Sequence, residues 1–461
     1  MQLISPLPLL VALAAPLLAP AAEEKPVSFH KDIVPIFKKS CNGCHHPGKM
    51  KGDLDLTTYE AFKKGGKHGP AFKPGDAQGS SVIEEITGEE PSMPKEGDPL
   101  TKDEVALIAR WIAQGAVDDT PAGAGSLRPA QPPVYPVAPV VSALAWSPDG
   151  RWLAVSGYHE VLLHSGDGSN LIARLLGESP RIESVAFSPD GHRLAVAASA
   201  PGRFGEIQIW DLTQPTATNA LQWARKVATD AVFGISWAPD GRRLAVGGAD
   251  KSVRVFAAAE GKELLKFDNH SDWVFATAFT TNGARLLSGS RDRAMKLIDA
   301  ATGQFIDDIN KLLEPVQCFA RHPRADLVAY GGEMGGTRIY RISDNQGRTA
   351  ANNDVNLVKE LERLPGPVCA VAFSPDGETL AIGGMAPEVR LHAAKDGQRK
   401  ATLKGHEGAI FALTFHPASN WVATAGFDGS IRIYETDKGE LVSRFSSVPV
   451  QPPTGQRASA R

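Results

Sequence analysis

The sequence has few cysteines and almost no excess charge. Only four of the 461 residues are cysteines, which excludes a framework of several disulfides. Lysine and arginine together number 49 and aspartate and glutamate 52, a formal net charge of -3. Such a balance supplies no basic surface for phosphates, so nucleic acid is not expected as a partner. Glycine (45) and proline (34) are plentiful and favour many turns and short strands.

Long apolar runs are absent except at the amino terminus. Residues 1–22 are apolar and carry no charged side chain, and the small residues Ala19 and Ala21 stand near their end. This pattern predicts a secretory signal peptide, residues 1–21, cleaved after Ala21 to leave a periplasmic protein. Four prolines disfavour the alternative of an uncleaved membrane anchor. No stable membrane span is therefore expected.

The rest of the chain divides into parts of different character. Residues 22–117 are rich in lysine and have helical periodicity, whereas residues 141–445 are strand-like and repetitive. Between them, residues 118–140 contain six prolines, which predicts a stiff, extended linker. The polar residues 446–461 are expected to form a disordered tail. The sequence thus predicts two domains, a linker and a tail.

Two of the four cysteines lie three residues apart in the segment CNGCH. The thiols of Cys41 and Cys44 can form thioethers with one haem, and His45 then lies beneath the iron. A zinc half-site would need a second pair of ligands, and Cys318 and Cys369 are isolated in the other domain. A thioredoxin-type pair would need a βαβ pattern, which is missing. A covalently bound haem is the prediction.

Amphipathic helices are predicted on both sides of this motif. Phe29, Ile33, Ile36 and Phe37 lie on one helical face, with Pro35 tolerable only in the first turn.

A second helix is predicted after the capping box of Thr101 and Glu104. Its apolar face includes Trp111, and Gly115 can end it in a left-handed conformation. Packing of the two helices is expected to bury Phe37 and Trp111 near the haem.

The sixth iron ligand must approach from the other side of the ring. Met93 lies in a loop flanked by prolines, and its thioether would raise the reduction potential. Met50, His68 and an open coordination position are the alternatives. Met93 is the ligand that we predict.

The first domain resembles planctomycete-type cytochrome c domains over about 90 residues. The matching segments are Pro74-Gly75-Asp76, Ser81-Val82-Ile83, Met93-Pro94, Pro99-Leu100-Thr101 and Trp111 to Ala116. The resemblance implies a small all-α, class I-like fold with one covalent haem c. It also implies Cys41 and Cys44 as thioether sites, and His45 and Met93 as axial ligands. Lys95 departs from the pattern, because such domains often have a second proline there.

Charge is distributed unevenly within this domain. Residues 23–73 hold ten lysines and six acids, a net +4, whereas residues 74–117 hold three basic residues and nine acids, a net -6. The lysines around the motif form a cationic rim that can steer an acidic redox partner. Lysines that merely solvate a helix are the alternative interpretation. The rim residues are Lys38, Lys39, Lys49 and Lys51.

The second domain repeats one turn seven times. Each turn ends a short apolar strand, and successive turns are 41 to 52 residues apart. Four short strands per repeat is typical of a propeller blade, so seven blades are predicted. The turns are Ser147-Pro-Asp-Gly150, Ser188-Pro-Asp-Gly191, Ala238-Pro-Asp-Gly241, Thr280-Thr-Asn-Gly283, His322-Pro323, Ser374-Pro-Asp-Gly377 and His416-Pro417.

These repeats resemble WD40 repeats over about 300 residues, with one literal WD pair, Trp210-Asp211. His270 with Asp292 and His406 with Asp428 match the family's histidine and turn aspartate. The resemblance implies that they lock a blade by hydrogen bonds to a strand hydroxyl, such as that of Ser288 or Thr424. Catalysis or metal binding by these residues is the alternative.

Three further expectations concern the propeller. Cys318 and Cys369 are expected to be buried small hydrophobes. The strand at residues 440–445 completes the last blade, so closure by strand exchange is not evident. Residues 135–137 could supply it, but their prolines make a poor strand.

Together these features predict an exported single-haem c-type cytochrome that transfers single electrons, with the propeller as a protein-docking scaffold. On this prediction the chain is an electron carrier rather than an enzyme. One alternative is a catalytic propeller, resembling nitrite reductases or quinone-cofactor dehydrogenases, for which the cytochrome is the electron conduit. The nitrite-reductase alternative is disfavoured, because those propellers have eight blades without WD patterning, whereas this sequence has seven repeated turns. Another alternative is a haem-based redox or gas sensor, which a labile Met93 would favour.

Overall fold

The computed structural model describes residues 25–46, 49–120, 129, 131–217, 220–309, 313–342 and 354–451. The chain divides into two compact units that part between residues 121 and 122, apart from the short segment His46–Lys49. The predicted signal peptide, much of the first half of the linker and the last ten residues lie outside the described residues. No helix of the described ranges is both long and apolar enough to cross a membrane.

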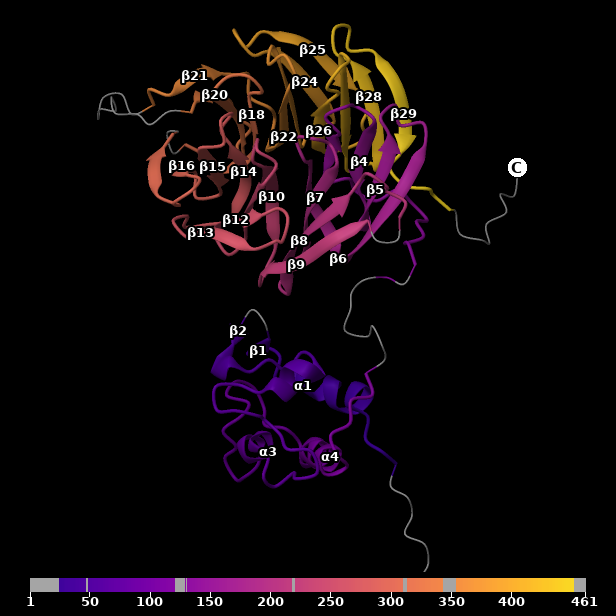
Figure 1. Ribbon diagram of the computed structural model, residues 1–461, viewed down its shortest axis with the longest axis vertical. Helices are drawn as coiled ribbons and strands as arrows, with labels where there is room; N and C mark the ends of the chain where they lie inside the picture. Colours follow the sequence, from indigo (N-terminus) through magenta and orange to yellow (C-terminus); the bar gives the residue numbers. More distant parts are fainter. Residues whose placement is uncertain are drawn as a thin grey trace, which may run out of the picture. The chain divides into compact units, whose positions relative to one another are not determined.

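The first unit is built from short helices and one small hairpin (Figure 1). Its elements are η1 (Phe29–Ile33), α1 (Val34–Ser40), β1 (His45–His46), β2 (Lys49–Met50), η2 (Lys51–Asp53), α2 (Tyr59–Lys64), α3 (Ser81–Ile86) and α4 (Lys102–Ala113).

The first predicted helix forms as a π-helical turn, η1, that continues into α1. Pro35 is the second residue of α1, so one main-chain donor is missing where η1 continues into α1. The four apolar residues of the predicted face are all buried, which confirms the prediction. They are Phe29, Ile33, Ile36 and Phe37.

Helix α4 has the predicted caps at both ends. The Thr101 hydroxyl accepts from the Glu104 N–H at 3.2 Å, and the Glu104 carboxylate accepts from the Thr101 N–H at 2.8 Å. At the other end Gly115 has φ 99°, and the Ala116 N–H donates to the carbonyl of Trp111 at 2.9 Å. This is a Schellman-type end, so α4 begins and ends where the sequence predicted.

Aromatic rings fill the core of the first unit. The Trp111 ring centroid lies 5.1 Å from that of Phe29 and 5.3 Å from that of Phe72, and Phe62 packs on Phe37 at 5.0 Å. Trp111 is 1% exposed, and its indole N–H donates to the carbonyl of Val117 at 3.0 Å. Phe37 and Trp111 therefore share one core, as predicted.

The second unit is made of antiparallel sheets (Figure 1). One sheet has seven strands: β3 (Leu144–Trp146), β4 (Trp152–Ser156), β5 (Tyr158–Ser165), β6 (Leu171–Phe187), β7 (Arg193–Ala200), β8 (Phe204–Asp211) and β9 (Leu221–Ala228). Five sheets have four strands each, and the first two of these are β10 (Val232–Trp237), β11 (Arg243–Gly248), β12 (Val253–Ala257), β13 (Glu263–Phe267), and β14 (Val274–Phe279), β15 (Arg285–Ser290), β16 (Met295–Asp299), β17 (Phe305–Asp308).

The other three four-stranded sheets follow in chain order. They are β18 (Val316–Arg321), β19 (Leu327–Gly332), β20 (Thr337–Arg341), β21 (Leu357–Glu360), then β22 (Val368–Phe373), β23 (Thr379–Gly384), β24 (Glu388–Ala393), β25 (Arg399–Lys404), then β26 (Ile410–Phe415), β27 (Trp421–Gly426), β28 (Ser430–Glu435), β29 (Leu441–Ser446).

Strand β6 belongs to two groups of four strands. Its first part, from Leu171 to Leu176, pairs with β5, whereas its last part, from Ile182 to Phe187, pairs with β7. The seven-stranded sheet therefore contains two four-stranded groups that share one long strand. The mostly β architecture is as predicted.

The first strands of successive groups contact one another in a cycle. Strands β3, β6, β10, β14, β18, β22 and β26 each contact the next, and β26 contacts β3 again. These strands surround the centre of the unit (Figure 1). Long connections join the third and fourth strands of two groups, between β8 and β9 and between β20 and β21.

The chain segments before and after the sheets pack together, which corrects two predicted boundaries. Tyr135, assigned to the linker, is only 6% exposed, and Ser447 and Val448, assigned to the tail, are buried. Tyr135 forms a parallel bridge with Val450, and its carbonyl accepts from the Gln451 N–H at 2.8 Å. Burial of Tyr135 and Val448 against the first and last sheets holds both segments in place. The linker therefore ends earlier than residue 140, and the tail begins later than residue 446.

Candidate haem site

The CNGCH segment forms a turn at the end of α1. The Cys41 N–H donates to the carbonyl of Phe37 at 2.8 Å, and the His45 N–H donates to the carbonyl of Cys41 at 3.1 Å. On the other side, the carbonyls of Cys44 and His45 accept from the N–H groups of Lys51 and Leu56. Hydrogen bonds thus fix the main chain of the motif on both sides.

The two thiols of the motif are free, and Cys41 packs against the aromatic core. Burial, and next the carboxylate of Glu104, raise the pKa of the Cys41 thiol to about 11. Because this value is far above neutrality, Cys41 is a protonated thiol at physiological pH. Neither cysteine forms a disulfide, so both sulfurs are available for covalent attachment of a group.

The imidazole of His45 has an uncommitted ring nitrogen. Its Nδ1 is buried and has no hydrogen-bond partner among the described residues, and the same holds for Oδ1 of Asn42. Buried polar atoms normally have partners, so these atoms indicate a missing group. An imidazole with a free nitrogen beside two free thiols fits the donor set that a c-type haem requires.

Met93, the predicted sixth ligand, packs against the same core as Cys41. Both side chains are partly buried and pack against it. The Met93 N–H donates to the carbonyl of Glu85 in α3 at 2.9 Å, which fixes the loop. Met50, in contrast, is 48% exposed, and His68 is exposed.

Part of the predicted cationic rim is neutralised. Lys38, Lys39 and Lys51 are exposed, and the side chain of Lys49 lies outside the described residues. The Lys39 ammonium lies 3.1 Å from the carboxylate of Glu104, the residue whose charge also acts on Cys41. The rim therefore contains at least one acidic residue beside the motif.

The described parts of the chain contain no group of three or more histidine, cysteine, aspartate and glutamate side chains arranged to hold a metal ion. Cys318 and Cys369 belong to β18 and β22 of the second unit.

Two of the four-stranded sheets contain the predicted histidine–aspartate lock. His270 Nδ1 lies 2.8 Å from Asp292, and its Nε2 lies 2.7 Å from the Ser288 hydroxyl. Burial would raise the pKa of Asp292, but the hydrogen bond and charge of His270 and two main-chain N–H groups lower it to about 2. His406 makes the same contacts with Asp428 and Thr424, which confirms the predicted structural role.

Other sheets use buried ion pairs that the sequence did not reveal. In the β18–β21 sheet, Arg338 lies 3.3 Å from buried Glu314 and donates to the Tyr330 hydroxyl at 2.6 Å. In the first group, Arg174 bonds to buried Glu160, which also accepts from the Tyr135 hydroxyl at 2.7 Å. A charged residue on a strand that otherwise alternates apolar residues is the signal that could have identified these pairs.

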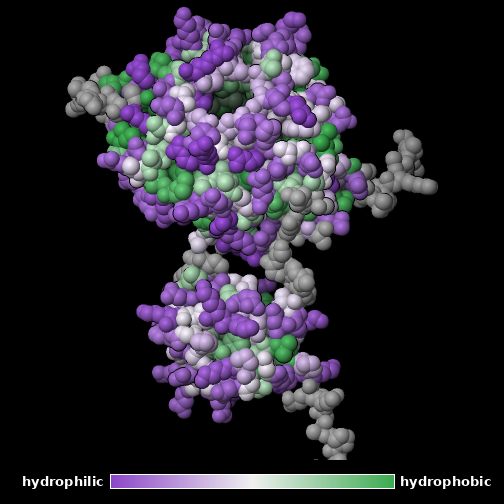
Figure 2. Space-filling view, viewed as in Figure 1, coloured by the Kyte–Doolittle hydropathy of each residue, from purple (hydrophilic) through white to green (hydrophobic). Residues whose placement is uncertain are grey.

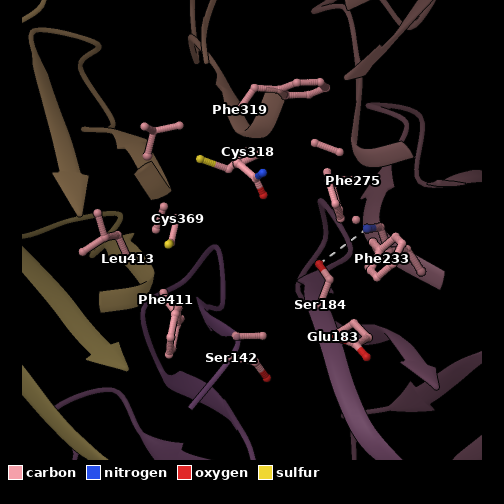
Figure 3. A pocket seen from close by; sticks show the side chains of 18 of the residues that line it. Ser142, Glu183, Ser184, Phe233, Phe275, Cys318, Phe319, Cys369, Phe411 and Leu413 are labelled. Carbon is pink, nitrogen blue, oxygen red and sulfur yellow. Dashed lines mark hydrogen bonds between the residues drawn. The ribbon is translucent and has the colours of Figure 1, made fainter. Parts of the chain in front are cut away.

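A cavity of about 330 Å³ lies between the seven innermost strands (Figure 3). Each strand contributes three consecutive residues, for example 142–144 from the first and 411–413 from the last. Cys318 and Cys369 line this cavity and are partly buried, so they are more accessible than the buried small hydrophobes that the sequence predicted. Figure 2 shows a hollow near the centre of this unit, with apolar residues below a polar edge.

Both parts of the chain match known families. Residues 41–97, which include the CNGCH segment and Met93, match the family described as planctomycete cytochrome C. Residues 137–169, 261–299, 358–391 and 397–435 match the WD domain, G-beta repeat, and residues 203–276 match the anaphase-promoting complex subunit 4 WD40 domain. The chain therefore joins a planctomycete-type cytochrome c domain to WD40 repeats, as the sequence predicted.

Several curated proteins are similar to parts of this chain. Mouse telomerase protein component 1 is 29% identical over 138 residues, 30% of this chain and 5% of that protein. Eukaryotic translation initiation factor 3 subunit I of Caenorhabditis elegans is 30% identical over 118 residues, 22% of this chain and 36% of that protein. Rat WD repeat-containing protein 1 is 30% identical over 116 residues, 25% of this chain and 18% of that protein. The matches thus span between 5% and 36% of the lengths of these relatives.

Proposed function

We propose that this protein is an exported c-type cytochrome that carries single electrons and docks to a partner protein through a seven-bladed WD40 propeller. It binds one haem covalently in its first unit. The mature protein is periplasmic and begins after Ala21, where the amino-terminal pattern predicts cleavage. Neither unit needs a substrate pocket of its own for this role.

The turn at the end of α1 carries the proposal. Cys41 and Cys44 supply the two thioether bonds, and His45 binds the iron. The support is that both thiols are free and that the buried His45 Nδ1 has no hydrogen-bond partner in the described chain. The bound haem supplies reversible one-electron chemistry at its iron.

Met93 is the second axial ligand in this proposal. It packs against the same core as Cys41, and the hydrogen bond from its N–H to Glu85 holds the loop. Thioether ligation raises a reduction potential, so the residue also tunes the electron-transfer range. The exposed lysines near the motif would attract an acidic redox partner.

The second unit acts as the docking scaffold. Seven groups of four strands and a closed cycle of contacts between their first strands support a seven-bladed propeller. Large apolar side chains are exposed at one end of the sheets, in turns between second and third strands or just before a first strand. Exposed apolar groups of this kind mark protein contact surfaces. They are Trp273, Met334, Met385 and Phe427.

The absorption spectrum tests the proposed function. Protein purified from a host with a haem c maturation system should give, after reduction in alkaline pyridine, the bands of a haem with two thioether bonds, at one haem per chain. Haem that acid–acetone extracts from the protein, or no haem at all, would contradict the proposal. Sequencing of the mature amino terminus tests export separately, because retention of residues 1–21 would overturn only that part.

A further inference from the structure

The seven innermost strands share one register relative to the turn that follows each. In each strand, two consecutive residues line the central cavity. They lie five and four positions before the first residue of the turn. The first set is Ser142, Glu183, Phe233, Phe275, Gln317, Cys369 and Phe411. The second set is Ala143, Ser184, Gly234, Ala276, Cys318, Ala370 and Ala412.

In β18 and β22 the pairing with the neighbouring strand shifts at the residue of the first set, between Val316 and Cys318 and between Val368 and Ala370. A bulge of this kind interrupts the regular alternation of side chains. The second set faces the next strand: a Cβ added to Gly234 would lie 2.6 Å from the carbonyl oxygen of Phe275. Ser184 does the same, since its hydroxyl accepts from the Ile235 N–H at 3.4 Å. Members of the first set contact one another across neighbouring strands, as the rings of Phe233 and Phe275 do at 5.0 Å.

At the contact between β18 and β22 this register brings two cysteines together. The thiol of Cys318 faces β22 and lies 3.7 Å from the carbonyl oxygen of Val368, the residue before Cys369. The thiol of Cys369 lies 3.8 Å from the carbonyl oxygen of Pro367, the residue before Val368, and the charge of Cys369 contributes to the raised pKa of the Cys318 thiol. Figure 3 shows both side chains on neighbouring parts of the cavity wall. No other strand of the cycle has a cysteine at either position.

We propose that Cys318 and Cys369 are a disulfide-forming pair that cross-links β18 to β22. The oxidant is a low-molecular-weight disulfide. The Cys369 thiolate attacks one sulfur of this molecule, which forms a mixed disulfide and releases the first small thiol. The Cys318 thiolate then attacks Sγ of Cys369 and displaces the second small thiol. Two protein thiols lose two electrons and two protons, and one external disulfide is reduced to two thiols.

Two properties of the site set how this pair behaves. Burial raises the pKa of both thiols, so few thiolates exist at neutral pH and the exchange is slow. Once formed, the bond joins two sheets through residues 51 positions apart in the sequence, and this restricts the unfolded chain. The oxidised protein is therefore expected to resist unfolding better than the reduced protein.

Peptide mapping of the full-length protein tests the pair. The folded protein is incubated with oxidised glutathione, alkylated without reduction and digested. The expected product is a cross-linked peptide pair that contains Cys318 and Cys369, lighter by two hydrogens than the two free peptides. The melting temperature of the second unit should rise by about 5 °C or more on oxidation. Later treatment with a thiol reductant should reverse this rise.

Matched variants separate the cross-link from other effects of oxidation. Cys318→Ser and Cys369→Ser should each melt like the reduced parent, and neither should gain stability with oxidised glutathione. Two free thiols after prolonged incubation, or a separate glutathione on each cysteine, would overturn the proposal. The result does not depend on haem, because mapping identifies Cys41 and Cys44 in different peptides. A protein without haem could still contain the Cys318–Cys369 bond.

Discussion

The two units of this protein organise their stability and their chemistry differently. The first unit has one core around Trp111, and the candidate haem ligands occur once each at its edge. The second unit divides its core into clusters, for example the one in which Val141 and Val448 join the first sheet to the last. A single substitution can therefore remove the chemistry of the first unit, whereas the second has several equivalent contacts. The predictions below test this contrast.

The largest effect is expected from the two cysteines of the first unit. Replacing Cys41 and Cys44 together with alanine should abolish covalent haem completely, because no other thiol lies in that unit. Denaturing gel electrophoresis with haem staining measures the loss. The matched control is the double variant of Cys318 and Cys369 to alanine, which should keep its haem. Equal haem staining of both double variants would contradict the assignment of haem attachment to Cys41 and Cys44.

The next effect concerns the sixth ligand. Met93→Ala should lower the reduction potential, within the roughly 0.8 V range that axial ligands span, and should change the ferric spectrum. Potentiometric titration and absorption spectroscopy measure both. Met50→Ala, at an exposed position, is the control and should change neither. A ferric spectrum that is unchanged in Met93→Ala would remove Met93 as a ligand.

Tryptophan substitutions compare a core position of the first unit with a partly exposed position of the second. Trp111→Ala removes the ring at the centre of the first unit and should destabilise that unit by about 3–5 kcal/mol. Trp273→Ala, in the second unit, removes a ring that is 38% exposed, and should cost only about 1 kcal/mol. Denaturant unfolding, followed by helical and sheet circular dichroism, measures the two values. Similar losses in both variants would show that the second unit depends equally on single residues.

A smaller effect than that of Trp111→Ala is expected from one of the two histidine–aspartate locks. Asp292→Asn should destabilise the second unit by about 1–3 kcal/mol at neutral pH, because it weakens the bonds to His270 and to two main-chain N–H groups.

The pH dependence of this lock follows from its lowered pKa. Folding lowers the pKa of Asp292 from its ordinary 3.8 to about 2, so the charged carboxylate stabilises the fold above pH 3.8. This stabilisation is lost as the pH falls towards 2, and the difference between parent and variant should shrink there. Urea unfolding at several pH values measures this, and Asp428→Asn is the equivalent variant in the last sheet. A difference that grows on acidification would contradict the assignment.

Features that depend on local sequence could be predicted. The capping box of Thr101 and Glu104 and the end of α4 at Gly115 involve neighbouring residues, so their pattern is sufficient. The repeated turn likewise predicted the strands around it. Helices α2 and α3 were missed, because six residues are too few for a clear apolar period.

Features that join distant residues were not predicted. The pairing of Tyr135 with Val450 and the ion pair of Glu314 with Arg338 depend on how the sheets close and pack. Cys318 and Cys369 looked isolated, since 51 positions separate them. Counting each from its own turn, His322 or Ser374, would have placed them on adjacent strands at neighbouring positions. The repeat register therefore contained more information than the sequence interpretation used.

Intact-mass spectrometry of the mature protein tests the central claim most directly. The account predicts a denatured polypeptide, beginning after Ala21, that is heavier than its sequence by one haem, with Cys41 and Cys44 unreactive towards alkylating reagents. A mass equal to that of the bare polypeptide, with both thiols alkylated, would contradict it.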